Sequence, residues 1–174
     1  MPYSMSSSSL PVLETGLDAL TAVLDKALAF TKTKDMDPAV MLQFRLAPDM
    51  FPLVRQVQVA ADAAKNGIAR LAGVEAPRFE DNETTIEQLK DRLMRTVAFL
   101  KTIDAGKLDA AGDREISFPL GPKNHGHMTG ADYLRHFVLP NFYFHRTTAY
   151  AILRHLGVEI GKQDFLGAIP IRIT

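Results

Sequence analysis

The sequence predicts an all-α fold, a four-helix bundle with a small β-hairpin in the crossover before the last helix. Four long segments carry apolar residues at steps of three or four, the spacing that gathers side chains on one face of a helix. Before the last of these segments, the pattern changes to glycine, proline and aspartate around a short alternating stretch. Four amphipathic helices with one non-helical crossover fit a bundle whose polar sites lie on inward faces.

The first helix is expected to begin at Leu10 and to carry its apolar stripe to Leu28. Ser9 is its expected N-cap, because a serine hydroxyl accepts hydrogen bonds from the free N–H groups of a helix start. Pro38 then marks a short helical piece over residues 37–46, since proline is accepted in the first turn of a helix.

The second long helix is predicted over residues 49–72 and ends at Gly73, a residue type that commonly closes helices. Residues 73–82 indicate a surface loop. Thr84 and Glu87 form a capping-box pattern that opens the third long helix. The expected buried stripe of that helix consists of Ile86, Leu89, Leu93, Val97 and Leu100.

The hairpin is predicted from Ile116, Phe118 and Leu120, which alternate as in a half-buried strand, with a turn near residues 121–124. The last helix follows over residues 131–156. There, Pro140 is expected to kink or split the helix, because proline lacks a backbone donor and clashes one turn back. After Gly161 the tail is expected to be extended and partly buried, with alternating Ile169, Ile171 and Ile173.

Length and composition exclude several classes of protein. A chain of 174 residues falls within the usual size of one domain, so residues 1–174 are expected to form a single domain. Lys plus Arg and Asp plus Glu number 20 each, and this balance argues against nucleic-acid and membrane partners. There is no cysteine, so any metal site needs His, Asp, Glu or water. The chain shows no signal-peptide pattern, and a soluble cytoplasmic protein is the expectation.

Three of the five histidines lie on the predicted last helix, namely His136, His145 and His155. Successive helical residues rotate by about 100°, so these three side chains point in different directions and cannot share one ion. Asn141 lies four residues before His145 and therefore shares its face. An amide and an imidazole are thus predicted to point into the bundle together.

The opposing groups of a pocket are expected on the helix predicted over residues 49–72. That segment has no histidine, but Asp49 and Gln56 are seven residues apart and nearly in line at the edge of its apolar stripe. The predicted pocket therefore consists of Asp49, Gln56, Asn141 and His145. Arg45 and Arg55 are close in sequence and are candidates to pair with Asp49 or to bind an anion.

Structural alternatives exist for each of these histidines. A single histidine on an apolar helix is more often a satisfied core or boundary residue than a ligand. His125 and His127 have a spacing compatible with metal on one strand face, but no third ligand is near, which favours a solvated hairpin. The sequence contains no glycine-rich phosphate loop, no GxSxG and no HExxH, so the common nucleotide-binding, serine hydrolase and zinc protease motifs are absent.

The segments RLAPDMFPL (45–53), PNFYFH (140–145) and TTAYAILR (147–154) resemble a family of unknown function within the bacterial DinB/YfiT-like superfamily. The resemblance covers nearly the whole chain. It implies an up-and-down type of four-helix bundle with a long crossover, often assembled as a homodimer. In the wider superfamily it also implies a divalent metal held by three histidines, two of them one turn apart on the last helix and one on the second.

This chain departs from that pattern at two of the three positions. Asn141 lies one turn before His145, and the second helix offers Gln56 or Asp49 in place of histidine. Only His145 carries over from the implied ligand set. Amide oxygens are weaker ligands than imidazole for zinc or nickel.

Three functional hypotheses follow. The first is binding of a small-molecule ligand by Asp49, Gln56, Asn141 and His145. The second is a transferase or hydrolase that depends on a divalent metal (Zn, Ni or Mn), with His145 as one ligand and Asp49 or His136 as another. The third is a dimeric structural or stress-associated protein whose helices only pack.

Overall fold

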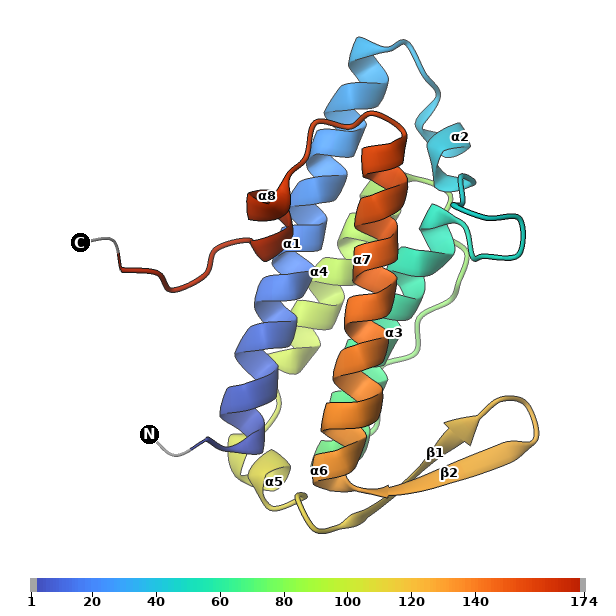
Figure 1. Cartoon of the computed structure of the whole chain (residues 1–174). Helices are drawn as coiled ribbons and strands as arrows, with labels where there is room; N and C mark the ends of the chain where they lie inside the picture. Colours follow the sequence, from blue (N-terminus) through green and yellow to red (C-terminus); the bar gives the residue numbers. More distant parts are fainter. Residues whose placement is uncertain (1–2, 173–174) are drawn as a thin grey trace.

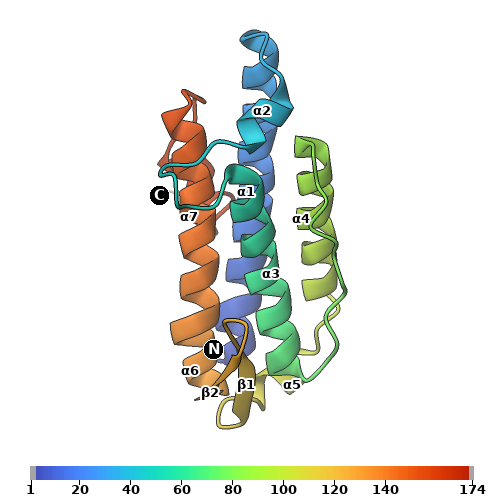
Figure 2. The same ribbon diagram turned by 90° about the vertical axis from the view of Figure 1, so that its right-hand side faces the viewer.

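The computed structural model describes residues 3–172, and four long helices lie side by side in it as a bundle (Figures 1 and 2). They are α1 (Met5–Thr33), α3 (Leu53–Ala72), α4 (Ile86–Leu100) and α7 (Leu139–His155), the last preceded by α6 (Gly130–Asp132) and the π-helical segment η1 (Tyr133–Val138). The shorter elements are α2 (Pro38–Leu42), α5 (Ala105–Asp109), α8 (Lys162–Leu166) and the antiparallel strands β1 (Glu115–Leu120) and β2 (Asn124–Thr129). The predicted fold class is therefore confirmed. None of the described helices combines the length and the apolar character needed to cross a membrane.

Helix α1 begins earlier than the sequence predicts. Its N-cap is Ser4, which forms a capping box with Ser7, whereas Ser9 is buried inside the helix and donates to the Met5 carbonyl. Asp109 explains the extra turn, because its carboxylate accepts from both the backbone N–H and the hydroxyl of Ser6, at 2.7 and 3.0 Å. The prediction of Ser9 as N-cap is wrong because that stabilising partner is remote in sequence.

The start of α3 also differs from the prediction. The helix begins at Leu53 after Pro52, and Asp49 lies exposed in the preceding loop. A proline disfavours helical geometry in the residue before it, so Phe51 cannot continue a helix into Pro52. Gly73 closes α3 with a left-handed φ of 67°, as expected.

The third long helix, α4, has the capping box one residue later than predicted. Thr85 and Gln88 form it, in place of Thr84 and Glu87. All five residues of the predicted apolar stripe of this helix are buried.

The hairpin packs on the last helix through aromatic rings. Ile116 and Phe118 are buried, and the Phe118 ring lies 4.8 Å from that of Tyr133 and 4.4 Å from that of Phe137, measured between centroids. Leu120 is 52% exposed, so the buried part of the strand ends before it. The predicted turn position is confirmed, because Leu120 pairs with Asn124 across it.

Pro140 is accommodated without an interruption of the last helix, which continues through η1 into α7 (Figure 1). The residues before Pro140 adopt π-helical geometry, in which the N–H of Leu139 bonds the carbonyl of Leu134. The wider turn offers room for a proline ring that an α-helical turn lacks. The helix is therefore neither split nor ended at Pro140.

The C-terminal tail is not extended throughout. Lys162–Leu166 form α8, which lies beside α1 (Figure 1). Ile169 and Ile171 are 40% and 66% exposed, so the expected burial of the alternating isoleucines is not observed for these two. Ile173 lies outside the described residues.

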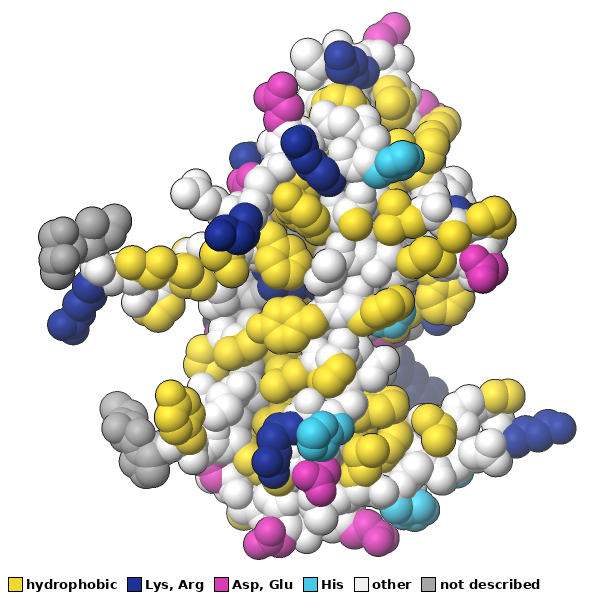
Figure 3. Space-filling view, viewed as in Figure 1, with side chains coloured by type: hydrophobic (Ala, Val, Ile, Leu, Met, Phe, Trp, Pro, Cys, Tyr) yellow, Lys and Arg dark blue, Asp and Glu magenta, His cyan; other side chains and the backbone are white. Residues whose placement is uncertain are grey.

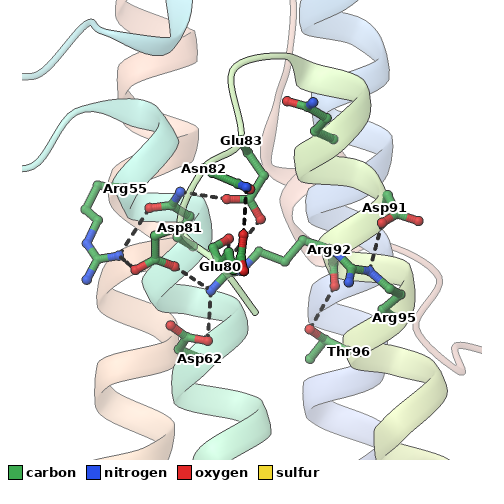
Figure 4. A network of polar contacts seen from close by, with 12 residues as sticks. Arg55, Asp62, Glu80, Asp81, Asn82, Glu83, Asp91, Arg92, Arg95 and Thr96 are labelled. Carbon is green, nitrogen blue, oxygen red and sulfur yellow. Dashed lines mark hydrogen bonds and ion pairs between the residues drawn. The ribbon is translucent and has the colours of Figure 1, made fainter. Parts of the chain in front are cut away.

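A buried guanidinium joins α4, α3 and the loop between them (Figure 4). Arg92 has no exposed surface, and its guanidinium lies within 3.0 Å of carboxylate oxygens of Asp62, Asp81 and Glu83. Gln58 donates to the second oxygen of Glu83 at 2.8 Å. Burial alone would raise the pKa of Glu83, but the hydrogen bonds from Arg92 and Gln58 outweigh it and lower that pKa.

We expect Arg92→Ala to lower the free energy of unfolding by about 3–5 kcal/mol, because it leaves the Glu83 carboxylate buried without its cation. Urea denaturation measures this change. The matched control is Arg95→Ala on the same helix, whose half-exposed side chain pairs with Asp91 and should contribute less than about 1 kcal/mol. Equal effects of the two substitutions would show that burial of Arg92 has no special role.

Candidate histidine site between α3 and α7

The imidazole of His145 and the amide of Gln56 meet between α7 and α3. His145 Nδ1 lies 2.7 Å from Gln56 Oε1, and Gln56 Nε2 donates to the backbone carbonyl of Phe51 at 3.0 Å. Because a carbonyl only accepts, the amide NH₂ must face Phe51, and its oxygen must face the imidazole. The proton therefore sits on Nδ1 of His145, and Nε2 carries the free lone pair.

Two aromatic rings flank this imidazole. The Phe51 ring is stacked near it, with centroids 6.4 Å apart, and the Phe144 ring meets it edge-on at 5.1 Å. Both rings are more than half exposed, whereas His145 is only 8% exposed. Among residues 3–172, Nε2 of His145 has no hydrogen-bond partner, yet it is not one of the atoms sealed from solvent. The site is thus a largely buried imidazole with one accessible nitrogen between two rings.

The environment keeps His145 neutral. Burial lowers the pKa of its imidazole, and the positive charge of Arg55 lowers that pKa further. Arg55 is itself held in place, because it pairs with Asp81, donates to Gln58 and lies over the Phe51 ring. At neutral pH, Nε2 is therefore a hydrogen-bond acceptor or a base, not a cation.

Asn141 lies one turn before His145 and lines a groove between η1, α7 and α3. The groove has a volume of about 200 Å³. Its lining includes Val59, Asn66, Arg70, Tyr133, Phe137 and Asn141. The Asn141 amide donates to the Phe137 carbonyl at 2.7 Å, which leaves its side-chain oxygen as an acceptor.

The structure brings together only part of the predicted pocket. Gln56 and His145 are in contact, and Asn141 lies one helical turn away on the same helix. Asp49 is exposed in the loop before α3 and forms no hydrogen bond or ion pair with these three side chains within residues 3–172. His136 has a side chain that is 68% exposed and lies 4.0 Å from Asp132, outside the interface between α7 and α3.

These residues do not fit the divalent metal that the superfamily resemblance implies. Within the described part of the chain, no three His, Cys, Asp or Glu side chains gather as a metal-binding group. The oxygen of Gln56 accepts from His145 Nδ1, so it is already engaged. His145 alone offers an imidazole nitrogen, which is one ligand of the three or four that a zinc site uses.

Sequence reasoning missed the roles of Phe51, Phe144 and Arg55 around His145. The contact of Phe51 with His145 is not predicted, because the apolar spacing places residues 49–52 in a helix. Pro52 is the local signal for a loop there. From the sequence, Arg55 is a candidate only as a partner of Asp49 or of an anion, and Phe144 carries no distinctive signal. The approach of both residues to His145 depends on how α7 packs against α3.

The fold and sequence place this chain among known relatives. The family model described as "Domain of unknown function (DUF1993)" matches residues 5–166. The fold is similar to the crystal structure of a DinB family member protein from Shewanella denitrificans, with a TM-score of 0.90. The two sequences are 40% identical over an alignment that covers 97% of this chain and 95% of that chain. No curated protein matches significantly. The chain therefore belongs to the DUF1993 family and, with it, to the DinB proteins.

Proposed function

We propose that this protein binds a small molecule between α3 and α7, with His145 Nε2 accepting a hydrogen bond from the ligand. The observation that carries the proposal is the chain of contacts from the Phe51 carbonyl through Gln56 to His145. It fixes the ring orientation and the tautomer before any ligand arrives. A preorganised acceptor loses less entropy on binding than a mobile one.

The neighbouring side chains favour a ligand with an apolar, flat body. Phe51 and Phe144 offer exposed rings on two sides of the imidazole, and aromatic groups prefer such offset or edge contacts. Asn141, one helical turn before His145, offers a second acceptor in the neighbouring groove between η1, α7 and α3, which His145 itself does not line. A neutral molecule with an aromatic body and a hydroxyl or N–H donor matches these features.

The charge of the site supports a neutral or anionic ligand over a cation. Arg55 lies close enough to His145 to lower the pKa of the imidazole, and the same field repels a cationic ligand. Asp81 neutralises part of that field through its ion pair with Arg55. The hydrogen bond to Nε2 should therefore determine which ligands bind.

A metal-dependent transferase or hydrolase has less support from the residues around His145. Such chemistry needs an ion held firmly enough to activate water or a nucleophile. Gln56 and Asn141 occupy the positions at which the superfamily pattern has histidines, and the amides of both side chains bond protein groups. The proposal of small-molecule binding needs no ion.

We expect phenol to bind at least about fivefold more tightly than anisole, which lacks the hydroxyl donor, because one hydrogen bond contributes about 1 kcal/mol or more. Titration followed by NMR measures both dissociation constants. His145→Ala should remove the preference for phenol, because it removes the acceptor of the phenol hydroxyl. His155→Ala, at an exposed position on the same helix, is the control. Equal affinities for phenol and anisole in the native protein would contradict the proposal.

The pKa of His145 should lie below the ordinary value of 6.5 and should rise in Arg55→Gln, which removes a nearby positive charge. Because the pKa is lower in the folded chain, the neutral ring contributes stability above pH 6.5 that is lost as the pH falls through the folded pKa. NMR titration of the ring measures both values. Arg135→Gln, at an exposed arginine, is the control. An unchanged pKa in Arg55→Gln would refute the electrostatic coupling.

The native protein should retain no stoichiometric zinc, nickel or manganese, whereas the double substitution Gln56→His with Asn141→His should create stoichiometric zinc binding. The two changes add imidazoles on either side of His145, one across the helix interface and one a turn away. Elemental analysis and zinc titration measure the outcome. The control adds His145→Ala to the double variant and should lose the zinc. Tight metal in the native protein would instead favour a metalloenzyme.

A further inference from the structure

Arg146 is a buried cation on the side of α7 that faces α1. It follows His145 directly, and a rotation of about 100° per residue turns it away from α3. Its side chain is 5% exposed. The guanidinium donates to the backbone carbonyl of Phe165 and lies 4.0 Å from the centre of that residue's ring.

Among the described residues, the charge of Arg146 is not balanced by a carboxylate. Within residues 3–172, it forms no ion pair with any Asp or Glu, in contrast to the buried Arg92 with its three carboxylates. Burial lowers the pKa of Arg146, which reflects the cost of holding the charge away from water. Buried charges in proteins are normally paired, because holding an isolated charge away from water is unfavourable even after the surroundings relax.

The guanidinium also has unused donors. An arginine carries five N–H donors, and among the described residues only the Phe165 carbonyl accepts from this one. Its Nε and Nη1 atoms, which have no partner among the described residues, are not sealed from solvent, so these free donors reach an accessible space. A ligand that approaches through that space meets a charged, planar group with donors in place.

That space is a cavity of about 290 Å³ between α1, α7 and the C-terminal segment. Its lining is mainly apolar and includes Pro11, Val12, Leu166, Ile169 and Pro170, with Tyr143 beside Arg146. Of the residues that the structure describes, no acidic one lines this cavity. In the space-filling view, hydrophobic side chains gather along the seam between α1 and α7 and where the C-terminal segment leaves it (Figure 3).

Gly16 of α1 allows this arrangement. A Cβ atom at this position would lie 2.7 Å from the Phe142 ring and 3.4 Å from a terminal nitrogen of Arg146. An alanine at this position would therefore force the Phe142 ring away from α1 and would bring a Cβ atom into van der Waals contact with the guanidinium. A glycine inside a helix costs about 0.5–1 kcal/mol relative to alanine, so its presence here coincides with a specific need for space.

We propose that this cavity is a binding site for a small monocarboxylate with an apolar body, whose carboxylate pairs with Arg146. A carboxylate matches the planar fork of a guanidinium through two parallel hydrogen bonds. A single negative charge balances the single cation of the site, whereas a phosphate dianion would need another. The apolar lining then covers the body of the ligand, at a gain of about 25 cal/mol per Å² of apolar surface buried.

The carboxylate site is separate from the histidine site and does not depend on it. The two sites use neighbouring residues of α7 but different partner helices, α3 for His145 and α1 for Arg146. A ligand at one site therefore need not occupy the other. Substitutions at His145 test only the histidine site, and those at Arg146 test only the carboxylate site.

The experiment is calorimetric titration of the full chain with benzoate and octanoate, each compared with its uncharged amide. We expect both carboxylates to bind at least tenfold more tightly than benzamide and octanamide. Arg146→Met should abolish that preference, and Arg154→Met, at an exposed arginine two turns further along α7, should leave it unchanged. Val12→Phe, which fills the cavity and keeps Arg146, should also weaken carboxylate binding.

A measurement of the stability of Arg146→Met distinguishes ligand binding by Arg146 from a purely structural role of this residue. If Arg146 only anchors the C-terminal segment, Arg146→Met should destabilise the fold in urea and the native protein should not distinguish carboxylates from amides. That pair of results would overturn the proposal. The expected pair is a free energy of unfolding that is unchanged or higher, since an unpaired buried charge is removed, together with lost carboxylate binding. Carboxylate binding that persists in Arg146→Met would equally refute it.

Discussion

The buried guanidinium of Arg92 is the interaction on which the arrangement of this bundle depends. It holds Asp81 and Glu83 of the connecting loop against α3 and α4, and Asp81 in turn pairs with Arg55. Arg55 is the charge that acts on His145. A contact between α4 and a loop is therefore linked, through Asp81 and Arg55, to the electrostatic environment of an imidazole on α7, where burial is the larger effect. Mutual pairing of this kind is what makes several buried charges tolerable in so small a domain.

The sequence predicted the parts of the fold that depend on local patterns. Apolar residues at helical spacing located all four long helices, and Gly73 marked a helix end, because both signals act within a few residues. Helix starts were less predictable. The first turn of α1 forms on the remote carboxylate of Asp109, and the start of α3 is set by Pro52. The start of α1 thus depends on a tertiary contact. The start of α3 depends on a local proline signal, but the regular apolar spacing around it favours an earlier helix start.

The residues of the candidate sites also fall into those that local spacing predicts and those that depend on tertiary packing. Helical spacing was enough to place Asn141 and His145 on one face and to name Gln56 as a possible partner. It gave no sign that Arg92 or Arg146 would be buried, because arginine is usually a surface residue and burial depends on the neighbouring elements. Asp49 lies apart from Gln56 and His145, because its segment is an exposed loop before α3. Buried arginines are thus the residues that only the three-dimensional structure reveals.

The π-helical segment before Pro140 is the part of the continuous last helix whose aromatic rings pack on the hairpin. Tyr133 and Phe137 lie in this segment and pack on the hairpin, whereas His145 and Arg146 lie beyond it and pack on α3 and α1. A π-turn holds more residues than an α-turn, so it behaves as an insertion absorbed within a helix. Gain or loss of one residue here would rotate the hairpin around the bundle axis and leave both buried faces of α7 in register. The direction of the hairpin can therefore change in evolution while the contacts of His145 with α3 and of Arg146 with the C-terminal segment stay in place.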